Sequence, residues 1–186
     1  MKDHEVIVGI TGGIAAYKSA ILVSRLVQSG HAVQVIMTQS AHQFIGQATF
    51  AALAGRPVFT NMFDGQDTYP LGPHIELARK SDLLCIAPAT ADVIGKTANG
   101  LSDSLLTTLY LCFEGPVLMA PAMNCEMWNK PAVQRNVETL KQDGVQMVGP
   151  NEGWLSCRAK GAGRMAEADE LFDAIQTTLN SKNQSK

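Results

Sequence analysis

The chain has 186 residues, of which 46% are hydrophobic and 17% are charged. This length suits one domain with a substantial core, and the low share of charged residues indicates that part of the surface is buried against other subunits. A net charge of −2 without a basic cluster argues against a nucleic-acid-binding module. No apolar run approaches the ~20 residues that cross a bilayer, and the charged start at 1–5 is not a signal peptide.

The cysteines Cys85, Cys112, Cys125 and Cys157 show no Cys-x-x-Cys pairing, and two of them lie within apolar runs. Buried free thiols of this kind are typical of a reducing compartment. We therefore expect a cytoplasmic protein that uses neither a membrane nor a metal ion.

Apolar, strand-like runs alternate with helical patterns along most of the chain, which favours an α/β fold with a parallel sheet. Strands are expected at 5–10, 32–37, 58–63, 83–87, 116–120 and 145–148, and helices at 14–29, 43–54, 74–80, 93–100, 103–113, 131–143 and 166–180. The pattern predicts a single doubly wound, Rossmann-like or flavodoxin-like domain at 1–180, followed by a frayed tail at 181–186. Residues 149–165 hold four glycines around Trp154 and Cys157. A connection of this length is usually functional and often a lid, so we expect a glycine-rich flap there.

Gly12 and Gly13 separate the first expected strand from the first expected helix. This arrangement leaves backbone N–H groups free at a helix N-terminus, which suits a phosphate. The spacing is not Gly-x-Gly-x-x-Gly, so a mononucleotide fits better than NAD. A tight turn without a ligand is the alternative. Thr38 and Ser40 follow the second strand, where they would either bond the same phosphate or cap the next helix.

The stretch at 121–128, Pro-Ala-Met-Asn-Cys-Glu-Met-Trp, follows another buried strand. Ligands of open α/β sheets bind at the carboxyl ends of strands, so a site is expected here. Asn124 carries an amide that both donates and accepts, which suits a carboxylate or an amide, and Met127 could form a wall of the cleft. A strand–turn–helix corner capped by Asn124 is the alternative. His74, at a helix start after a flexible loop, has no chemical role that its sequence context alone establishes.

Five motifs occur in one order: 9–18, 74–77 (His-Ile-Glu-Leu), 88–92 (Pro-Ala-Thr-Ala-Asp), 121–128, and the segment around Cys157 that ends in Gly-Ala-Gly-Arg-Met at 161–165. From Val6 to about Met165 the chain resembles the homo-oligomeric flavin-containing cysteine decarboxylases. The resemblance implies FMN as cofactor and a trimer, or a trimer-based dodecamer, with flavin sites between subunits. The likeness is greatest to those members that convert 4'-phosphopantothenoylcysteine into 4'-phosphopantetheine in coenzyme A biosynthesis.

The resemblance also implies roles for individual residues. His74 acts as the base, Asn124 holds the departing carboxylate, and Cys157 donates a proton to the enethiolate that remains. Oxidation of the substrate thiol to a thioaldehyde supplies the electron sink that decarboxylation needs, and flavin accepts the hydride. The FMN site implied by position comprises Gly12, Gly13, Thr38, Ser40, Thr90, Ala91, Asp92 and Ser102. Met127 would contact the substrate, and Arg164, Lys160 and Arg158 are candidates for its phosphate.

Arg158 stands where the family commonly has a glycine after the flap cysteine. The ligase domain of bacterial bifunctional relatives has no counterpart in the sequence, so either a separate phosphopantothenate–cysteine ligase is a partner or the chain serves another pathway. Other interpretations are a decarboxylase of C-terminal peptidyl cysteine that stops at the enethiol, a flavin prenyltransferase, a regulatory subunit without catalysis and a flavin-binding electron-transfer module. The presence of His74, Asn124 and Cys157 favours the complete reaction.

Overall fold

Five parallel strands form the centre of the structure, a computed structural model that describes residues 4–65 and 68–184. They are β1 (Glu5–Ile10), β2 (Ala32–Met37), β3 (Leu83–Ala89), β4 (Val117–Pro121) and β5 (Gln146–Met147). Their order is β2-β1-β3-β4-β5, and every pairing in this sheet is parallel. The strand order reverses between β1 and β3. Doubly wound folds bind ligands at such a switch point, outside the carboxyl ends of the strands.

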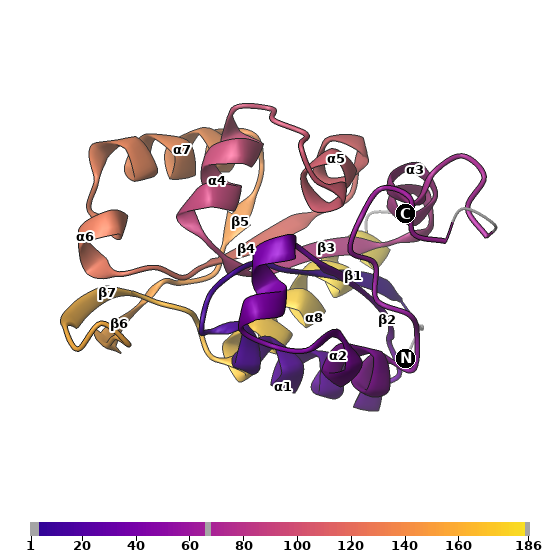
Figure 1. Ribbon diagram of the computed structural model, residues 1–186, viewed down its shortest axis with the longest axis horizontal. Helices are drawn as coiled ribbons and strands as arrows, with labels where there is room; N and C mark the ends of the chain where they lie inside the picture. Colours follow the sequence, from indigo (N-terminus) through magenta and orange to yellow (C-terminus); the bar gives the residue numbers. More distant parts are fainter. Residues whose placement is uncertain (1–3, 66–67, 185–186) are drawn as a thin grey trace.

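Helices cover both faces of this sheet (Figure 1). On one face lie α1 (Ala16–Gln28), α2 (Gln47–Ala54) and α8 (Ala168–Gln184), and on the other lie α4 (Ala91–Ala98), α5 (Leu105–Cys112) and α7 (Pro131–Gln142). The 3-10 helix η1 (Gln39–Gln43), α3 (Pro73–Lys80), which packs against α5, and the short α6 (Cys125–Trp128) complete the helical elements of the described chain. The expected α/β doubly wound fold is confirmed.

The strands read as continuous apolar runs because both of their faces are buried. In β1, Val6 and Val8 belong to the cluster beneath α1, while Ile7 belongs to the cluster beneath α4 and α5. All three side chains are fully buried. A parallel sheet covered on both sides leaves no strand face for polar residues, which is why the strands lack the alternation of a half-exposed sheet.

Residues 149–165 form an antiparallel hairpin of β6 (Asn151–Trp154) and β7 (Lys160–Arg164). The hairpin lies at the opposite end of the molecule from α3 (Figure 1). Its glycines serve close packing as well as turning. A Cβ added at Gly161 would lie 2.8 Å from Cβ of Cys125, and one added at Gly163 would lie 2.3 Å from the carbonyl oxygen of Met123. The segment is therefore an ordered ribbon, and its action as a flap stays a prediction.

Three expected elements differ in the structure. The strand expected at 58–63 is a single bridge between Ile36 and Phe59, because the Asp64 carboxylate accepts hydrogen bonds from the N–H groups of Thr60 and Asn61 and turns the chain away. The strand expected at 145–148 has only two residues, and the helix expected at 43–54 begins only at Gln47, after the 3-10 helix η1. α8 continues to Gln184, into the expected tail. Residues 1–3, 66–67 and 185–186 lie outside the described chain.

Within the described residues, no helix combines the length and the apolar character that crossing a bilayer requires.

We predict that Leu84→Ala destabilises the fold far more than Leu101→Ala. Leu84 is fully buried in β3, the central strand, so its truncation leaves a cavity that costs about 2–5 kcal/mol of unfolding free energy. Leu101 is 54% exposed and serves as the control. Denaturant unfolding of both variants measures the difference. Equal losses would show that β3 does not lie in the core.

Candidate active site

A cavity of about 950 Å³ opens at the carboxyl ends of the first four strands. Its lining includes the segments 11–14 after β1, 38–40 after β2, 90–93 after β3 and 122–124 after β4. The hairpin contributes 154–157 and 163–164. This volume lies near the upper end of the range for small-molecule sites, so the cavity has room for a cofactor together with a substrate.

The loop between β1 and α1 has the features of an anion cradle. The N–H groups of residues 12–15 donate no hydrogen bond within the described chain. Gly12 packs so closely on Ser40 that an added Cβ would lie 2.4 Å from the Cβ of that serine. The Thr38 hydroxyl oxygen is buried against this cavity without a hydrogen-bond partner among the described residues. Free N–H groups at a helix N-terminus, together with an unused hydroxyl, fit a phosphate.

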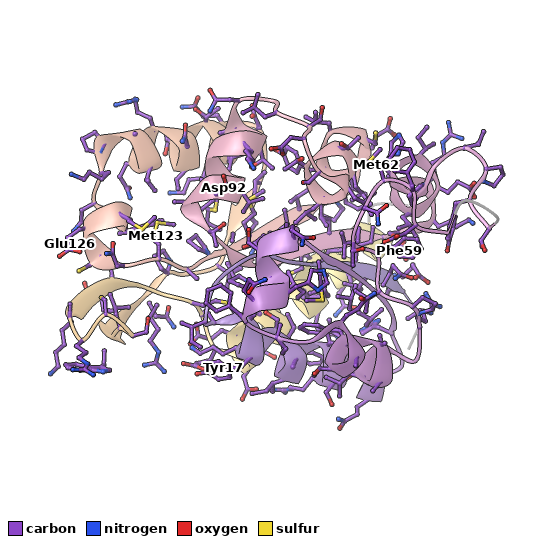
Figure 2. The ribbon with its side chains drawn as sticks, viewed as in Figure 1. Tyr17, Phe59, Met62, Asp92, Met123 and Glu126 are labelled. Atoms are coloured by element: carbon purple, nitrogen blue, oxygen red, sulfur yellow. The ribbon has the colours of Figure 1, made fainter. Side chains whose placement is uncertain are left out.

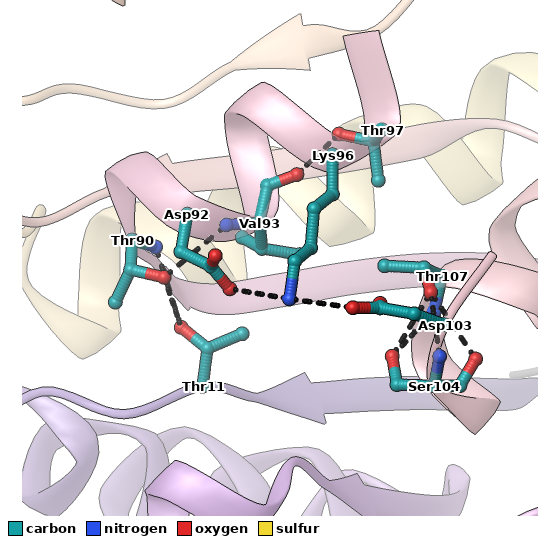
Figure 3. Close-up of polar contacts among 9 residues, drawn as sticks. All are labelled: Thr11, Thr90, Asp92, Val93, Lys96, Thr97, Asp103, Ser104 and Thr107. Atoms are coloured by element: carbon teal, nitrogen blue, oxygen red, sulfur yellow. Dashed lines mark hydrogen bonds and ion pairs between the residues drawn. The ribbon is translucent and has the colours of Figure 1, made fainter. Parts of the chain in front are cut away.

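Two hydroxyls connect this loop to the segment after β3 (Figure 3). Thr11 Oγ1 donates to the carbonyl oxygen of Pro88 over 2.6 Å and accepts from the N–H of Thr90 over 3.3 Å. Thr90 Oγ1 in turn caps α4 by accepting from the N–H of Val93. The loops after β1 and β3 therefore hold each other in place on either side of the switch point. Ala91 and Asp92, at the start of α4, line the cavity.

Lys96 joins α4 to the start of α5 along the same wall (Figure 3). Its Nζ lies 2.9 Å from Oδ2 of Asp103 and 3.2 Å from Oδ2 of Asp92. The hydrogen bond with Asp103 raises the pKa of Lys96, and the same bond lowers the pKa of Asp103. Asp103 and Ser104 line the cavity. Ser102, predicted at the flavin, is absent from the lining, and its carbonyl oxygen accepts a hydrogen bond from Thr108.

Asn124 caps a helix, as the alternative interpretation of its motif expected, and it also lines the cavity. Its Oδ1 accepts from the N–H of Met127 over 2.8 Å, which begins α6, and its Nδ2 donates to Oε2 of Glu126 over 3.0 Å. Met127, one turn further on, also lines the cavity. Figure 2 shows Met123 and Glu126 at the end of the molecule that carries α6. The cap fixes the amide, whose second N–H remains available for a carboxylate.

Cys157 lies in the turn of the hairpin, where it is exposed and lines the cavity. The turn is closed by the N–H of Leu155, which donates to the carbonyl oxygen of Ala159 over 2.9 Å. Arg158 adopts a φ of +65°, the left-handed conformation that glycine takes without strain. The backbone thus keeps a glycine-like shape at the position where the family commonly has glycine. Arg164 lines the cavity and pairs with Glu167.

His74 does not lie on this cavity. It belongs to α3, at the far end of the molecule from the hairpin (Figure 1). Gly72 has a φ of +91°, and a Cβ there would lie 2.9 Å from Cε1 of His74, so the glycine makes room for the ring. Nδ1 of His74 is buried without a hydrogen-bond partner in the described chain. Within one chain, the expected base and the expected proton donor therefore lie far apart.

Sequence reasoning missed several residues of the lining, among them Thr11, Lys18, Lys96 and Trp154. Thr11 was accessible to prediction, because it directly follows a strand. The spacing of Asp92 and Lys96, four residues apart on a helix, also indicated a pair. In the described ranges, 4–65 and 68–184, no group of three or more His, Cys, Asp or Glu side chains is placed to hold a metal ion.

Comparisons with known proteins agree on one family. The model of a family described as Flavoprotein matches residues 1–180. The coenzyme A biosynthesis bifunctional protein CoaBC of Mycobacterium tuberculosis is 45% identical over 184 residues, which cover 96% of this chain and 43% of that protein. The chain thus spans less than half the length of this relative.

Two solved structures share the fold over nearly the whole chain. One is a PPC decarboxylase mutant complexed with pantothenoylaminoethenethiol, with a TM-score of 0.83 and 28% identity, covering 95% of this chain and 98% of that one. The other is the FMN-dependent cysteine decarboxylase SpaF, with a TM-score of 0.82 and 31% identity over 96% of each chain.

The cysteines are predicted to differ in reactivity. Complete burial raises the pKa of the Cys85 thiol to about 12, so it carries almost no thiolate at pH 8, whereas Cys112 and Cys157 are exposed. A maleimide added to native protein at pH 8 should label the two exposed thiols and leave Cys85 unmodified until the protein is denatured. Peptide mass mapping measures this pattern. Fast labelling of Cys85 in the native protein would contradict its place in the core.

Proposed function

Because the chain belongs to the Flavoprotein family, we propose that it is an FMN-dependent decarboxylase that converts 4'-phosphopantothenoylcysteine into 4'-phosphopantetheine in coenzyme A biosynthesis. The observation that carries this proposal is the content of one cavity: an anion cradle, an oriented asparagine amide and an exposed thiol. The chain has 45% identity to a coenzyme A biosynthesis protein and shares its fold with a PPC decarboxylase. The proposed catalytic domain is 1–180, with the hairpin as its flap.

The cradle is proposed to hold the phosphate of FMN. Gly12 and Gly13 supply free N–H groups, the Thr38 hydroxyl lacks a partner, and Ser40 packs on Gly12. Thr90, Ala91 and Asp92 begin α4 on the same cavity and are proposed to lie along the flavin. FMN, when bound, supplies the hydride acceptor and donor that the reaction requires. The strand order agrees with this placement, since FMN binds at the β1/β3 switch point in flavodoxin-like folds.

Asn124 and Cys157 are proposed to act on the cysteine end of the substrate. The free N–H of the Asn124 amide donates to the substrate carboxylate and orients it until it leaves as CO2. The Cys157 thiol donates its proton to the carbon of the enethiolate, and burial under the hairpin excludes water during this step. Met127 lies one helical turn from Asn124 and is proposed to pack on the substrate chain. Arg164 lines the same cavity and offers a cation to the substrate phosphate.

His74 is proposed to reach the cavity of a neighbouring copy in a homo-oligomer, a trimer or a trimer-based dodecamer. Ile14, Tyr17 and Ile21 are 57%, 56% and 50% exposed and recur at helical spacing beside the cavity. Figure 2 shows Tyr17 on the outer side of α1. Near His74, Leu71 is 59% exposed. Exposed apolar side chains at two different places on one chain suit a head-to-tail contact that closes into a ring.

A decarboxylase of peptidyl cysteine is the second candidate, since such an enzyme needs Asn124 but no reducing half. The likeness to the FMN-dependent cysteine decarboxylase SpaF keeps it open. The exposed thiol of Cys157 on the cavity favours the complete reaction. The CoaBC relative is named a bifunctional protein, and the proposed partner for a second step is a separate phosphopantothenate–cysteine ligase. The proposed place of action is the cytoplasm.

Thr38→Val should weaken FMN binding. The variant keeps the shape of the side chain but removes the hydroxyl that lacks a partner, and a hydrogen bond to a charged group contributes about 1.5–3 kcal/mol. The dissociation constant of FMN should therefore rise roughly ten- to a hundredfold. Titration of apoprotein followed by flavin fluorescence measures this constant. Thr139→Val, on the surface of α7, is the matched control, and an equal effect in both variants would remove Thr38 from the cradle.

Cys157→Ser tests the function itself. Purified protein loaded with FMN is mixed with 4'-phosphopantothenoylcysteine, and product mass and flavin absorbance are followed together. The unaltered protein should release CO2 and phosphopantetheine and end with oxidised flavin. The variant should release CO2 but accumulate a product two hydrogens lighter, with bleached flavin, because its serine is a far weaker acid.

Each remaining outcome points to another function. If the unaltered protein itself stops at the lighter product, the chain is an oxidative decarboxylase. If neither protein releases CO2 while FMN stays bound, the decarboxylase proposal is wrong.

A further inference from the structure

Lys18 carries a charge that its place in the fold does not favour. It lies in the first turn of α1 and is only 5% exposed. The positive end of the helix dipole opposes a cation in this turn, and a buried charge is costly unless it is paired. Lys18 also lines the cavity beside the anion cradle, so the groups that bond it show which parts of the site it holds together.

The partners of Lys18 follow the hairpin directly. Nζ donates to the carbonyl oxygen of Met165 over 3.0 Å and to Oε1 of Glu167 over 2.9 Å. Met165 and Glu167 come immediately after β7, and Glu167 also pairs with Arg164, the last residue of that strand. The hydrogen bond from Lys18 lowers the pKa of Glu167, so the carboxylate stays charged. The buried ammonium of Lys18 thus joins α1, which begins at the anion cradle, to residues 165–167, the root of the hairpin.

The same root is attached on its other side to the Asn124 segment. The carbonyl oxygen of Gly163 accepts from the N–H of Met123 over 3.0 Å. The approach is so close that only glycine fits, since an added Cβ would lie 2.3 Å from the Met123 carbonyl oxygen. β7 and the residues that follow it are therefore held by two elements that both line the cavity. The turn with Cys157 extends beyond these attachments, so its placement over the cavity depends on them.

We propose that Lys18 is a positioning residue for Cys157. By fixing the return strand of the hairpin, its ammonium sets where the thiol meets the carbon that receives the proton. This inference rests on the proposed function, but it requires no contact between Lys18 and the substrate. Without the ammonium, the cradle and Asn124 keep their places, so CO2 still leaves. Proton delivery then slows, and the lighter, unsaturated product accumulates.

The test uses the FMN-loaded, full-length protein and two readouts. The variants are Lys18→Met, which keeps the length of the chain without the charge, Glu167→Gln, which keeps the shape of the partner, and Lys18→Arg, which restores a cation. Lys141→Met, at an exposed position of α7, is the control. The first readout is the rate of limited trypsin cleavage after Arg158 or Lys160, identified by fragment mass. The second is the ratio of unsaturated to saturated product in one turnover.

Lys18→Met and Glu167→Gln should be cleaved about tenfold faster than the unaltered protein, which corresponds to ~1.4 kcal/mol of lost attachment. Both should raise the share of unsaturated product severalfold at unchanged FMN content. Lys18→Arg should restore most of both values, and Lys141→Met should change neither. If Lys18→Met does not fold, Glu167→Gln decides, since its side chain is 43% exposed in the unaltered protein and its loss of charge is readily tolerated.

Unchanged cleavage and an unchanged product ratio in Glu167→Gln and Lys18→Met would overturn the proposal. Loss of FMN without faster cleavage would also overturn it, because Lys18 would then serve the cofactor. If the unaltered protein releases no CO2, the proposed function fails. The cleavage rates would then still show whether Lys18 holds the hairpin.

Discussion

The structure depends on the constraint that parallel strands end at the same edge of their sheet. The segments after β1, β2, β3 and β4 must therefore converge, and each leads into a helix that begins beside the shared space. Buried N–H groups need acceptors, and the helix dipoles favour negative charge. Phosphate and carboxylate are the ligands that such an edge attracts. The fold therefore favours anionic ligands at this edge independently of any single side chain.

The hairpin completes this edge with chemistry that the sheet lacks. The strand ends provide N–H groups, hydroxyls and an amide, which bind and orient anions. Cys157 adds an acidic thiol, and it comes from a ribbon attached to the sheet domain at few points. Gly163 permits one of these attachments and Lys18 makes another. A site assembled in this way can separate substrate binding from proton delivery, because proton delivery depends on where the hairpin lies.

Prediction from the sequence was best where one local rule decides the structure. The apolar run at 5–10 and the glycines after it correctly predicted a buried strand and a strand–turn–helix corner. Prediction from the sequence was worst where a side-chain contact with the backbone, or a contact between residues far apart in the sequence, determines the structure. Asp64 turns the chain away from the expected strand at 58–63. The glycines at 161 and 163 indicated an irregular loop, yet they allow a strand to pack on residues 123–125. Lys18 gave no local signal, since its partners lie 147 and 149 residues away.

We propose that a working site takes His74 from one copy and Cys157 from another, because α3 and the hairpin lie at opposite ends of the molecule (Figure 1). Mixing His74→Asn with Cys157→Ser, two variants that should each fail to form the saturated product, under conditions of subunit exchange tests this directly. Random assembly would pair the two intact residues in about a quarter of the sites. We predict that formation of the saturated product returns to about that fraction of the unaltered activity. If the mixture remains as inactive as its components although the subunits have exchanged, both residues serve a site within one chain, and the account is wrong.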